Sequence, residues 1–455
     1  MNESLRHPLL SEAGRAQLEA WREHPRAPMW NIVCGDRLDA SGLEHVRLFA
    51  RSCARGPQWT SFREPPPWAR EFALKYLSEV PFYRARGGDP NNWASIPPCD
   101  RLDLAREPWH FVPDALSLDE IVIYTTSGTT GSEALIPAHL RWPSTYLPLY
   151  ERALELNGVP WKSERARPEN QHRVPLATIA AQEHTLTFAA WSSYLDGANL
   201  KLNLHPSQWR APEDAAAFLN EANPQVLCGD PVSLSVLAQT NFSGQPLALI
   251  SSALALEPGV RATLQSRFSC PLIDIYSTNE SGPIAASTSQ SDALAVLPPD
   301  LWIEILRADG SSCEEDEAEE IVLSGGRNPF LPLLRYRSGD FARAQVLERA
   351  PHLLDFHGRA PIKLKAGEHE ILDIDITHAL RRIPLREFSL HQNLNGSLEF
   401  SYRPALGSSD TASEIEAVLR PLFEGHKLKI EELSAWSTGE RKLIRYSRES
   451  GSASD

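Results

Sequence analysis

Apolar and polar positions follow two different patterns along this chain. Residues 1 to about 120 carry helix-like stretches broken by Pro-rich segments such as REPPPWAR, which predicts a mainly helical lead-in. From residue 121 onward, short apolar runs alternate with helical patterns. QVLCG, LALISSA and PLIDIYS are typical of buried strands, and EPGVRATLQSRF of a helix. This alternation predicts an α/β architecture with a partly parallel sheet.

Capping and turn residues predict where several elements begin and end. Ser144 is expected to cap a helix through Leu154 that ends at Asn157-Gly158. Asp230-Pro231 is expected to start another helix, with Asp as cap and Pro in the first turn. LWIEILRADGSS and EEIVLSG predict a hairpin, and the acidic CEEDEAEE between them is interpreted as a solvated turn. TFAAWSSYLDGA is interpreted as a helical region.

The pattern changes after FHGRAPIKLKAG, and the remaining residues predict a small α+β unit. REFSLHQNLNGSLEFSYRP is expected to form a hairpin around Asn395-Gly396, and SEIEAVLRPLFEGH a capped helix. The tail near 447–455 is expected to be disordered. We therefore expect a large N-terminal domain at 1–358 and a small C-terminal domain at 359–455.

Charge and cysteine usage narrow the class of protein. The net charge of −14 disfavours a nucleic-acid partner and docking on an anionic membrane. No apolar run approaches the roughly 18 residues of a membrane span, and the N-terminus does not have the pattern of a secretory signal. The six cysteines are scattered without a CxxC pair, which supports neither a disulfide framework nor a zinc site and favours a reducing, cytoplasmic setting.

The segment IVIYTTSGTTGSEALIP, at 121–137, places six Ser and Thr side chains and two glycines after an apolar β-branched run. Gly128 and Gly131 allow tight turns and close approach of a ligand, and backbone N–H groups with Ser and Thr hydroxyls can hold a phosphate. A polar hairpin turn between two strands explains the same composition, and both interpretations stay open at this point. A P-loop is excluded, because no Lys follows Gly131.

Four later motifs give the loop a context: IYSTNESG at 275–282, LLRYRSGD at 333–340, FHGRAPIKLKAG at 356–367 and TGERKLIRY at 438–446. In this order, the five motifs resemble those of the adenylate-forming superfamily of acyl-CoA synthetases, luciferases and adenylation domains. EVPFYRARGG and PLLRYRSGD are similar to the phenylacetate–CoA ligase branch, which also lacks a Lys after the loop. The resemblance covers roughly residues 75 to 446.

The resemblance implies a large α/β AMP-binding domain with mixed and parallel sheets, followed by a small mobile α+β domain. It also implies ATP and Mg²⁺ as cofactors and a small carboxylic acid as substrate. The acid would attack the α-phosphate of ATP and expel pyrophosphate, a reaction that depends on positioning and charge neutralisation.

The resemblance also assigns roles to individual residues. Catalytic roles fall to Thr126 in the loop, to Glu280 as the Mg²⁺ ligand and to Lys442 as the cation that reaches the α-phosphate. Tyr276 would lie against adenine, and Asp340 and Arg359 would contact the ribose. The remaining nucleotide-binding residues would be Ser127, Gly128, Thr129, Thr130, Gly131, Ser252, Ala253, Ser277 and Asn279. Five of these assignments have an ordinary structural alternative: Tyr276 as a core aromatic, Glu280 as a turn cap, Asp340 in an Asx-turn, and Arg359 and Lys442 as surface cations.

Two departures from the family pattern affect function. Ser277 and Asn279 stand where the family usually has Gly and Thr, which changes the phosphate contact. Ala360-Pro361 stand at the hinge, where Pro restricts the backbone and puts the usual domain rotation in question. The acyl pocket is expected to be lined by Phe188, Trp191 and Tyr194, which suits an aromatic or compact acid, although all three also suit a core.

The sequence leaves three hypotheses for the function of the protein. The leading one is a ligase that forms an acyl-adenylate and passes it to coenzyme A. The second keeps the adenylate but transfers the acyl group to a carrier-protein phosphopantetheine or to an amine. The third is a non-catalytic nucleotide-binding protein, which the retained Glu280, Asp340 and Arg359 disfavour. A homodimer would suit the phenylacetate–CoA ligase branch.

Overall fold

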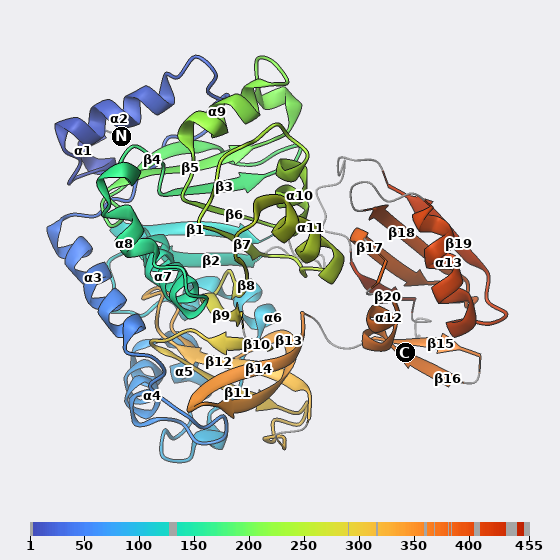
Figure 1. Cartoon of the computed structure of the whole chain (residues 1–455). Helices are drawn as coiled ribbons and strands as arrows, with labels where there is room; N and C mark the ends of the chain where they lie inside the picture. The colour runs from blue at the N-terminus through green and yellow to red at the C-terminus, as the bar shows by residue number, and fades with distance from the viewer. Residues whose placement is uncertain are drawn as a thin grey trace.

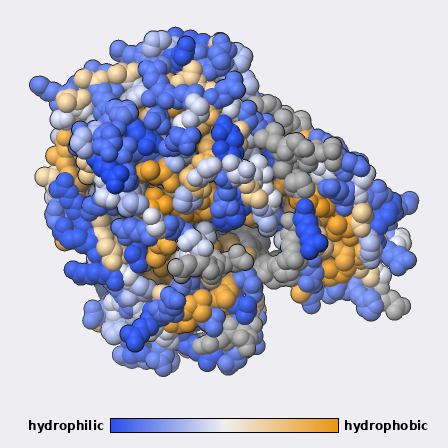
Figure 2. Space-filling model, viewed as in Figure 1, coloured by the Kyte–Doolittle hydropathy of each residue, from blue (hydrophilic) through white to orange (hydrophobic). Residues whose placement is uncertain are grey.

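The computed structural model shows a large body and a smaller C-terminal region beside it (Figure 1). The described residues are 3–126, 134–289, 291–314, 317–358, 362–367, 369–380, 382–383, 385–404, 410–433 and 444–449. Hydrophilic residues cover most of the face shown in Figure 2.

The lead-in is mainly helical, as the sequence predicts. Ser11 caps α2 by accepting a hydrogen bond from the Gly14 N–H, and Asp39 caps α3 through Gly42. The helices are α1 (Glu3–Arg6), α2 (Glu12–Arg22), α3 (Ala40–Ala54), α4 (Pro67–Glu79), α5 (Pro81–Arg86) and α6 (Arg101–Arg106). Short 3₁₀ turns follow at η1 (Trp93–Ser95), η2 (Pro108–Phe111) and η3 (Leu118–Glu120).

A 12-stranded mixed sheet forms the centre of the large body, in the order β11-β12-β13-β14-β10-β9-β8-β7-β6-β3-β5-β4. Neighbouring strands in the segment β5-β3-β6-β7-β8 are parallel, and the other pairs are antiparallel. The strands are β3 (Leu176–Ala180), β4 (Phe188–Ser192), β5 (Gly197–Asn203), β6 (Val226–Gly229), β7 (Ala248–Ser252), β8 (Leu272–Thr278), β9 (Gly282–Thr288), β10 (Ser291–Val296), β11 (Leu301–Leu306), β12 (Glu319–Gly325), β13 (Leu333–Leu347) and β14 (Ala350–His357). The predicted α/β class with a partly parallel sheet is confirmed.

Helices cover the parallel part of the sheet. They are α7 (Tyr146–Leu156), α8 (Trp161–Arg165), α9 (Asp214–Ala222), α10 (Pro231–Ala238) and α11 (Pro258–Phe268), with 3₁₀ turns η4 (Trp142–Thr145), η5 (Pro168–Asn170) and η6 (Pro206–Gln208). Asp230 accepts a hydrogen bond from Ser233 N–H and Pro231 occupies the first turn of α10, as predicted. The predicted hairpin of LWIEILRADGSS and EEIVLSG is present as β11 and β12.

Two sequence interpretations in this region are wrong. Ser144 does not cap α7: it lies in η4, and Thr145 precedes the helix without a side-chain cap bond. TFAAWSSYLDGA is not helical, because its side chains alternate between the two faces of β4. A tight turn at Asp196, with a left-handed φ of 49°, then returns the chain into β5.

The C-terminal region has its own sheet, in the order β19-β18-β17-β20, and a separate hairpin β15-β16. Its elements are β15 (Lys363–Ala366), β16 (His369–Leu372), α12 (Asp373–Leu380), β17 (Leu385–Gln392), β18 (Leu398–Pro404), α13 (Thr411–Leu422), β19 (Leu428–Glu432) and β20 (Tyr446–Arg448). The predicted hairpin around Asn395-Gly396 is present as β17 and β18. Asp410 precedes α13 in a left-handed conformation without a side-chain cap bond, so the predicted cap of that helix is wrong.

The small region packs against the start of α11 on the large body. Arg445 forms an ion pair with Glu257 at 2.5 Å, and its guanidinium lies 4.8 Å from the centroid of the Phe388 ring. The hydrophobic core of the small region is formed by its own residues, among them Leu390, Phe400 and Ile415. The contact through Arg445 is therefore polar, while each part buries a core of its own.

Candidate active site

Tyr276 and Asp340 meet between two strands that are not neighbours in the sheet. Tyr276, on β8, donates a hydrogen bond from its hydroxyl to Asp340 Oδ2, on β13, at 2.9 Å. Three strands separate β8 from β13 in the sheet order, so the sheet must curve to bring them face to face. Both side chains are buried, and burial together with the Asp340 charge raises the pKa of the Tyr276 hydroxyl well above its usual value.

A second tyrosine–carboxylate pair lies beside the first. Tyr336, also on β13, donates to Glu280 Oε1 at 2.9 Å, and the Arg101 guanidinium is 3.6 Å from the same oxygen. Glu280 is only 5% exposed. A buried carboxylate requires such partners, because an unpaired buried charge is costly.

The turn between β8 and β9 holds Glu280 in place. Ser281 donates its backbone N–H to Thr278 Oγ1 at 3.1 Å, and the two hydroxyl groups lie 3.0 Å apart. Ser277 is half-buried in this segment and Asn279 is exposed. The side chain of Glu280 is therefore directed inward while its neighbour Asn279 faces outward.

The Tyr276 ring packs against Phe356 of β14, with ring centroids 4.3 Å apart and planes tilted by 46°. Ser252 ends the adjacent parallel strand β7, where it pairs with Ile275 of β8. Ala253 follows with a left-handed φ of 72°, a strained conformation for a residue with a side chain. Ser252, Ala253 and Tyr276 lie at the carboxyl ends of the parallel strands β7 and β8, where open α/β sheets bind ligands.

The Gly-rich segment connects the two strands of a hairpin. β1 (Ile121–Thr126) pairs antiparallel with β2 (Ala134–His139), and Thr126 is the last residue of β1. Asn328 ties β2 to the site: its Nδ2 donates to the Pro137 carbonyl at 2.9 Å, and its Oδ1 accepts from His139 N–H. The predicted phosphate-binding residues Ser127, Gly128, Thr129, Thr130 and Gly131 lie outside the described residues, as do Arg359 and Lys442. The hairpin fits both interpretations of this segment.

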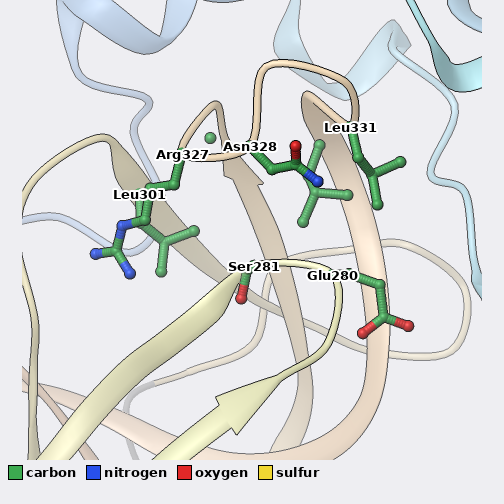
Figure 3. A pocket seen from close by; sticks show the side chains of 8 residues that line it. Glu280, Ser281, Leu301, Arg327, Asn328 and Leu331 are labelled. Atoms are coloured by element: carbon green, nitrogen blue, oxygen red, sulfur yellow. The ribbon is translucent and has the colours of Figure 1, made fainter. Parts of the chain in front are cut away.

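Asn328 and Glu280 also line a small pocket, in which Arg327 and Glu280 lie on opposite sides (Figure 3). Arg327 is buried and donates to the backbone carbonyls of Pro283, Leu297 and Pro299. Burial lowers the pKa of its guanidinium to about 10. The guanidinium of Arg327 therefore uses its donors on the backbone carbonyls that surround the site.

The three predicted acyl-pocket residues lie in different surroundings. Trp191 belongs to the hydrophobic core beneath α2, where a Cβ at Gly14 would come within 3.0 Å of its ring. The Tyr194 hydroxyl donates to Glu151, which also pairs with Arg165 at 2.5 Å. Phe188 lies at the start of β4, half-buried on the opposite face of that strand from Trp191.

The carboxylates of the candidate site decide how Mg²⁺ could be bound there. Among the described residues there is no group of three or more His, Cys, Asp or Glu side chains that could hold a metal ion. Mg²⁺ is commonly bound through one or two carboxylates together with substrate phosphates and water. The one carboxylate that Glu280 supplies fits that mode and would not fit an all-protein cage.

Several residues of the site were not predicted. Tyr336 lies inside the LLRYRSGD motif, two positions from Ser338, and this placement is the only sequence signal for it. Arg101 lies in the lead-in, far from the motifs, and carries no signal. Phe356 opens the FHGRAPIKLKAG motif without a role of its own being evident.

The fold is similar to that of solved structures of a CoA ligase. One is 2-hydroxyisobutyryl-CoA ligase in the postadenylation state with R3-HIB-AMP, at 16% identity, covering 84% of this chain and 88% of that chain with a TM-score of 0.61. The same ligase with 2-HIB-AMP gives 0.57, at the same identity and coverage. Its open conformation with 2-HIB-AMP and CoA gives 0.52 at 16% identity, covering 83% and 89%.

The comparisons by sequence give no match, either to a family model or to a curated protein. Within the described ranges, no helix is both long and apolar enough to cross a membrane.

Proposed function

We propose that this protein is an ATP-dependent acid–thiol ligase, which activates a carboxylic acid as an acyl-adenylate and transfers the acyl group to coenzyme A. The observation that carries the proposal is the pair of buried tyrosine–carboxylate contacts. Glu280 and Asp340 are both buried, and each accepts a hydrogen bond from a tyrosine: Glu280 from Tyr336 of β13, and Asp340 from Tyr276 near the carboxyl end of β8. The likeness of the fold to a solved CoA ligase and the resemblance of the motifs support the proposal.

Asp340 would bind the ribose. A carboxylate accepts hydrogen bonds at two oxygens, so it can hold both ribose hydroxyls while Tyr276 fixes its orientation. Tyr276 would at the same time lie against adenine. Preorganisation of this kind lowers the entropy lost when the nucleotide binds.

Glu280 would hold the metal. Mg²⁺, when bound, supplies positive charge that neutralises the phosphate oxygens of ATP. Until then Arg101 and Tyr336 satisfy the carboxylate. Thr126 and the residues to Gly131 would bind the β- and γ-phosphates through N–H groups and hydroxyls, while Ser252, Ala253, Ser277 and Asn279 complete the nucleotide site.

The small region would supply the mobile cations. Lys442 would stabilise negative charge on the α-phosphate and the acyl oxygen, and Arg359 would contact the ribose. No Lys follows the Gly-rich loop, so a cation from elsewhere is required there. We propose a position in the phenylacetate–CoA ligase branch, a homodimeric assembly and a cytoplasmic setting. The cysteines of the described segments, which are all free, support the last of these.

One feature of the sequence favours an acceptor of the acyl group other than coenzyme A. By the motif resemblance, Ala360-Pro361 would stand at the hinge, where Pro restricts the backbone, and this departure keeps open transfer to a carrier-protein phosphopantetheine or to an amine. The test has two steps. Acid-dependent ATP–pyrophosphate exchange over a panel of acids identifies the substrate. The same acid is then supplied with ATP and with coenzyme A, a carrier protein or amines, and the product is identified by mass.

A further inference from the structure

The hairpin of β1 and β2 is not part of the main sheet. It forms a sheet of its own, in which Thr126 at the end of β1 pairs with Ala134 at the start of β2. A two-stranded hairpin is marginally stable by itself, so its position depends on contacts with other parts of the fold. The proposed phosphate-binding segment joins these two strand ends. The contacts that place the hairpin therefore also place that segment.

The apolar face of β2 supplies one set of contacts. Ala134, Ile136 and Ala138 alternate along the strand and are fully buried. Ala134 and Ile136 lie in the same hydrophobic core as Tyr276 and Tyr336. The burial of apolar surface is non-directional, and two of these three side chains are single methyl groups. This packing attaches the hairpin to the core, but it does not by itself fix the position of β2 along its own axis.

Asn328 supplies directional contacts with the same strand. Its Nδ2 donates to the Pro137 carbonyl at 2.9 Å, and its Oδ1 accepts from the His139 N–H at 3.2 Å. The same Oδ1 accepts from the Phe330 N–H at 3.2 Å, within the loop of Asn328 itself. Asn328 is only 1% exposed, so a substitution that removes the carboxamide leaves the backbone groups of β2 without these partners in a buried setting. One side chain thus fixes the hairpin at two backbone positions.

The loop that carries Asn328 is itself fixed to the candidate site. It connects β12 to β13, the strand that carries Tyr336 and Asp340. The preceding residue, Arg327, donates to three backbone carbonyls around the site. Asn328 and Glu280 line the same small pocket (Figure 3). Asn328 therefore joins the hairpin to the part of the fold that holds the proposed metal ligand.

We propose that Asn328 is a positioning residue, which holds the segment between β1 and β2 where it and Glu280 act on the same triphosphate. This inference rests on the proposed function, in which the segment binds the β- and γ-phosphates and Glu280 holds Mg²⁺. Asn328 acts through the hairpin and does not contact the substrate. Its effect should fall on the ligands that carry these phosphates, ATP and pyrophosphate, and should spare AMP and the acid.

Asn328→Leu tests the inference, because it keeps the approximate size of the side chain and removes both bonds to β2. In ATP–pyrophosphate exchange it should raise the KM for ATP and for pyrophosphate by about 10-fold, the scale of one buried hydrogen bond, and leave the KM for the acid nearly unchanged. Calorimetric titration in the presence of Mg²⁺ should show a weakening of the same size for ATP and none for AMP.

Asn170→Leu is the matched control. Asn170 is also buried, and its Nδ2 donates to the Glu164 carbonyl at 3.0 Å, away from the hairpin. This variant should lose stability as well, but it should leave the KM values and the binding of both nucleotides unchanged. If Asn328→Leu does not fold, Asn328→Ser gives the same comparison, because it loses both bonds without adding an apolar side chain.

Two results in a folded variant would overturn the inference and leave the proposed function intact: an equal weakening of ATP and AMP, or unchanged binding of both. If no acid supports exchange, the proposed function fails, and the comparison of ATP with AMP still decides the role of Asn328. A wild-type protein that binds no ATP would contradict both.

Discussion

The Tyr276 hydroxyl donates to Asp340 Oδ2 at 2.9 Å across two strands that are not sheet neighbours. Asp340→Ala should therefore abolish acid-dependent pyrophosphate exchange, because the proposed ribose contact is lost. Tyr276→Phe removes only the hydroxyl that orients Asp340, and should raise the KM for ATP by about tenfold, the value of one hydrogen bond to a charged group. Initial-rate kinetics over a range of ATP concentrations measures both. Near-normal exchange in Asp340→Ala would remove this residue from the site. Asp309→Ala, on an exposed turn, is the control.

Glu280→Gln should also abolish exchange, through loss of the proposed metal contact. Tyr336→Phe keeps the carboxylate and loses only its hydrogen bond, so exchange should persist with an altered dependence on Mg²⁺ concentration. Titration of Mg²⁺ at saturating ATP measures this dependence. Circular dichroism and the melting temperature establish that each variant is folded. A Glu280→Gln protein with the Mg²⁺ dependence of the wild type would show that Glu280 does not act through the metal.

Lys442→Ala should separate the two half-reactions. A cation that acts mainly in the adenylation transition state is worth about 10²–10³ in rate. Overall turnover should therefore collapse, while transfer from a preformed acyl-adenylate to the thiol survives. Rapid-quench measurement of each half-reaction checks this. Equal loss in both would mean that Lys442 holds the small region in place, and unchanged turnover would leave it a surface lysine.

Asp274, on β8 two residues before Tyr276, predicts a pH effect on stability. Burial raises the pKa of this carboxyl from 3.8 to about 6. The folded protein therefore keeps a proton that the unfolded chain releases, and this residue's contribution to stability falls as the pH rises from about 4 to about 6. Asp274→Asn cannot ionise, so its free energy of unfolding relative to wild type should rise by about 2 kcal/mol between pH 4 and pH 7.5. Denaturant unfolding of both proteins at the two pH values measures the difference. A constant difference would show that Asp274 ionises as readily in the folded protein as in the unfolded chain.

The sequence predicts most elements whose signal is local. The Asp230-Pro231 helix start and the hairpin of β11 and β12 depend on neighbouring residues, and both are present. TFAAWSSYLDGA fails as a helix because pairing between β4 and β5 decides its structure. Pairing between strands depends on tertiary context, which overrides the local pattern.

The candidate site also contains residues with a local sequence signal and residues that only the tertiary structure identifies. Tyr276, Glu280 and Asp340 lie in short motifs, so the sequence can name them. Arg101 joins the site only when the fold brings it to Glu280 from a distant part of the chain, and no local sequence pattern indicates this. The roles of Arg359 and Lys442 rest on the motif resemblance alone, because both lie outside the described residues.

Acid-dependent ATP–pyrophosphate exchange tests the central claim most directly, because it requires an acyl-adenylate to form reversibly and needs no acceptor. Wild-type protein is incubated with ATP, Mg²⁺, labelled pyrophosphate and one acid at a time, beside Asp340→Ala as the matched inactive control. We predict label in ATP for at least one acid, absent without acid and absent in Asp340→Ala. If the wild type binds ATP but incorporates no label with any acid of a broad panel, the protein does not form acyl-adenylates and the proposed function is wrong.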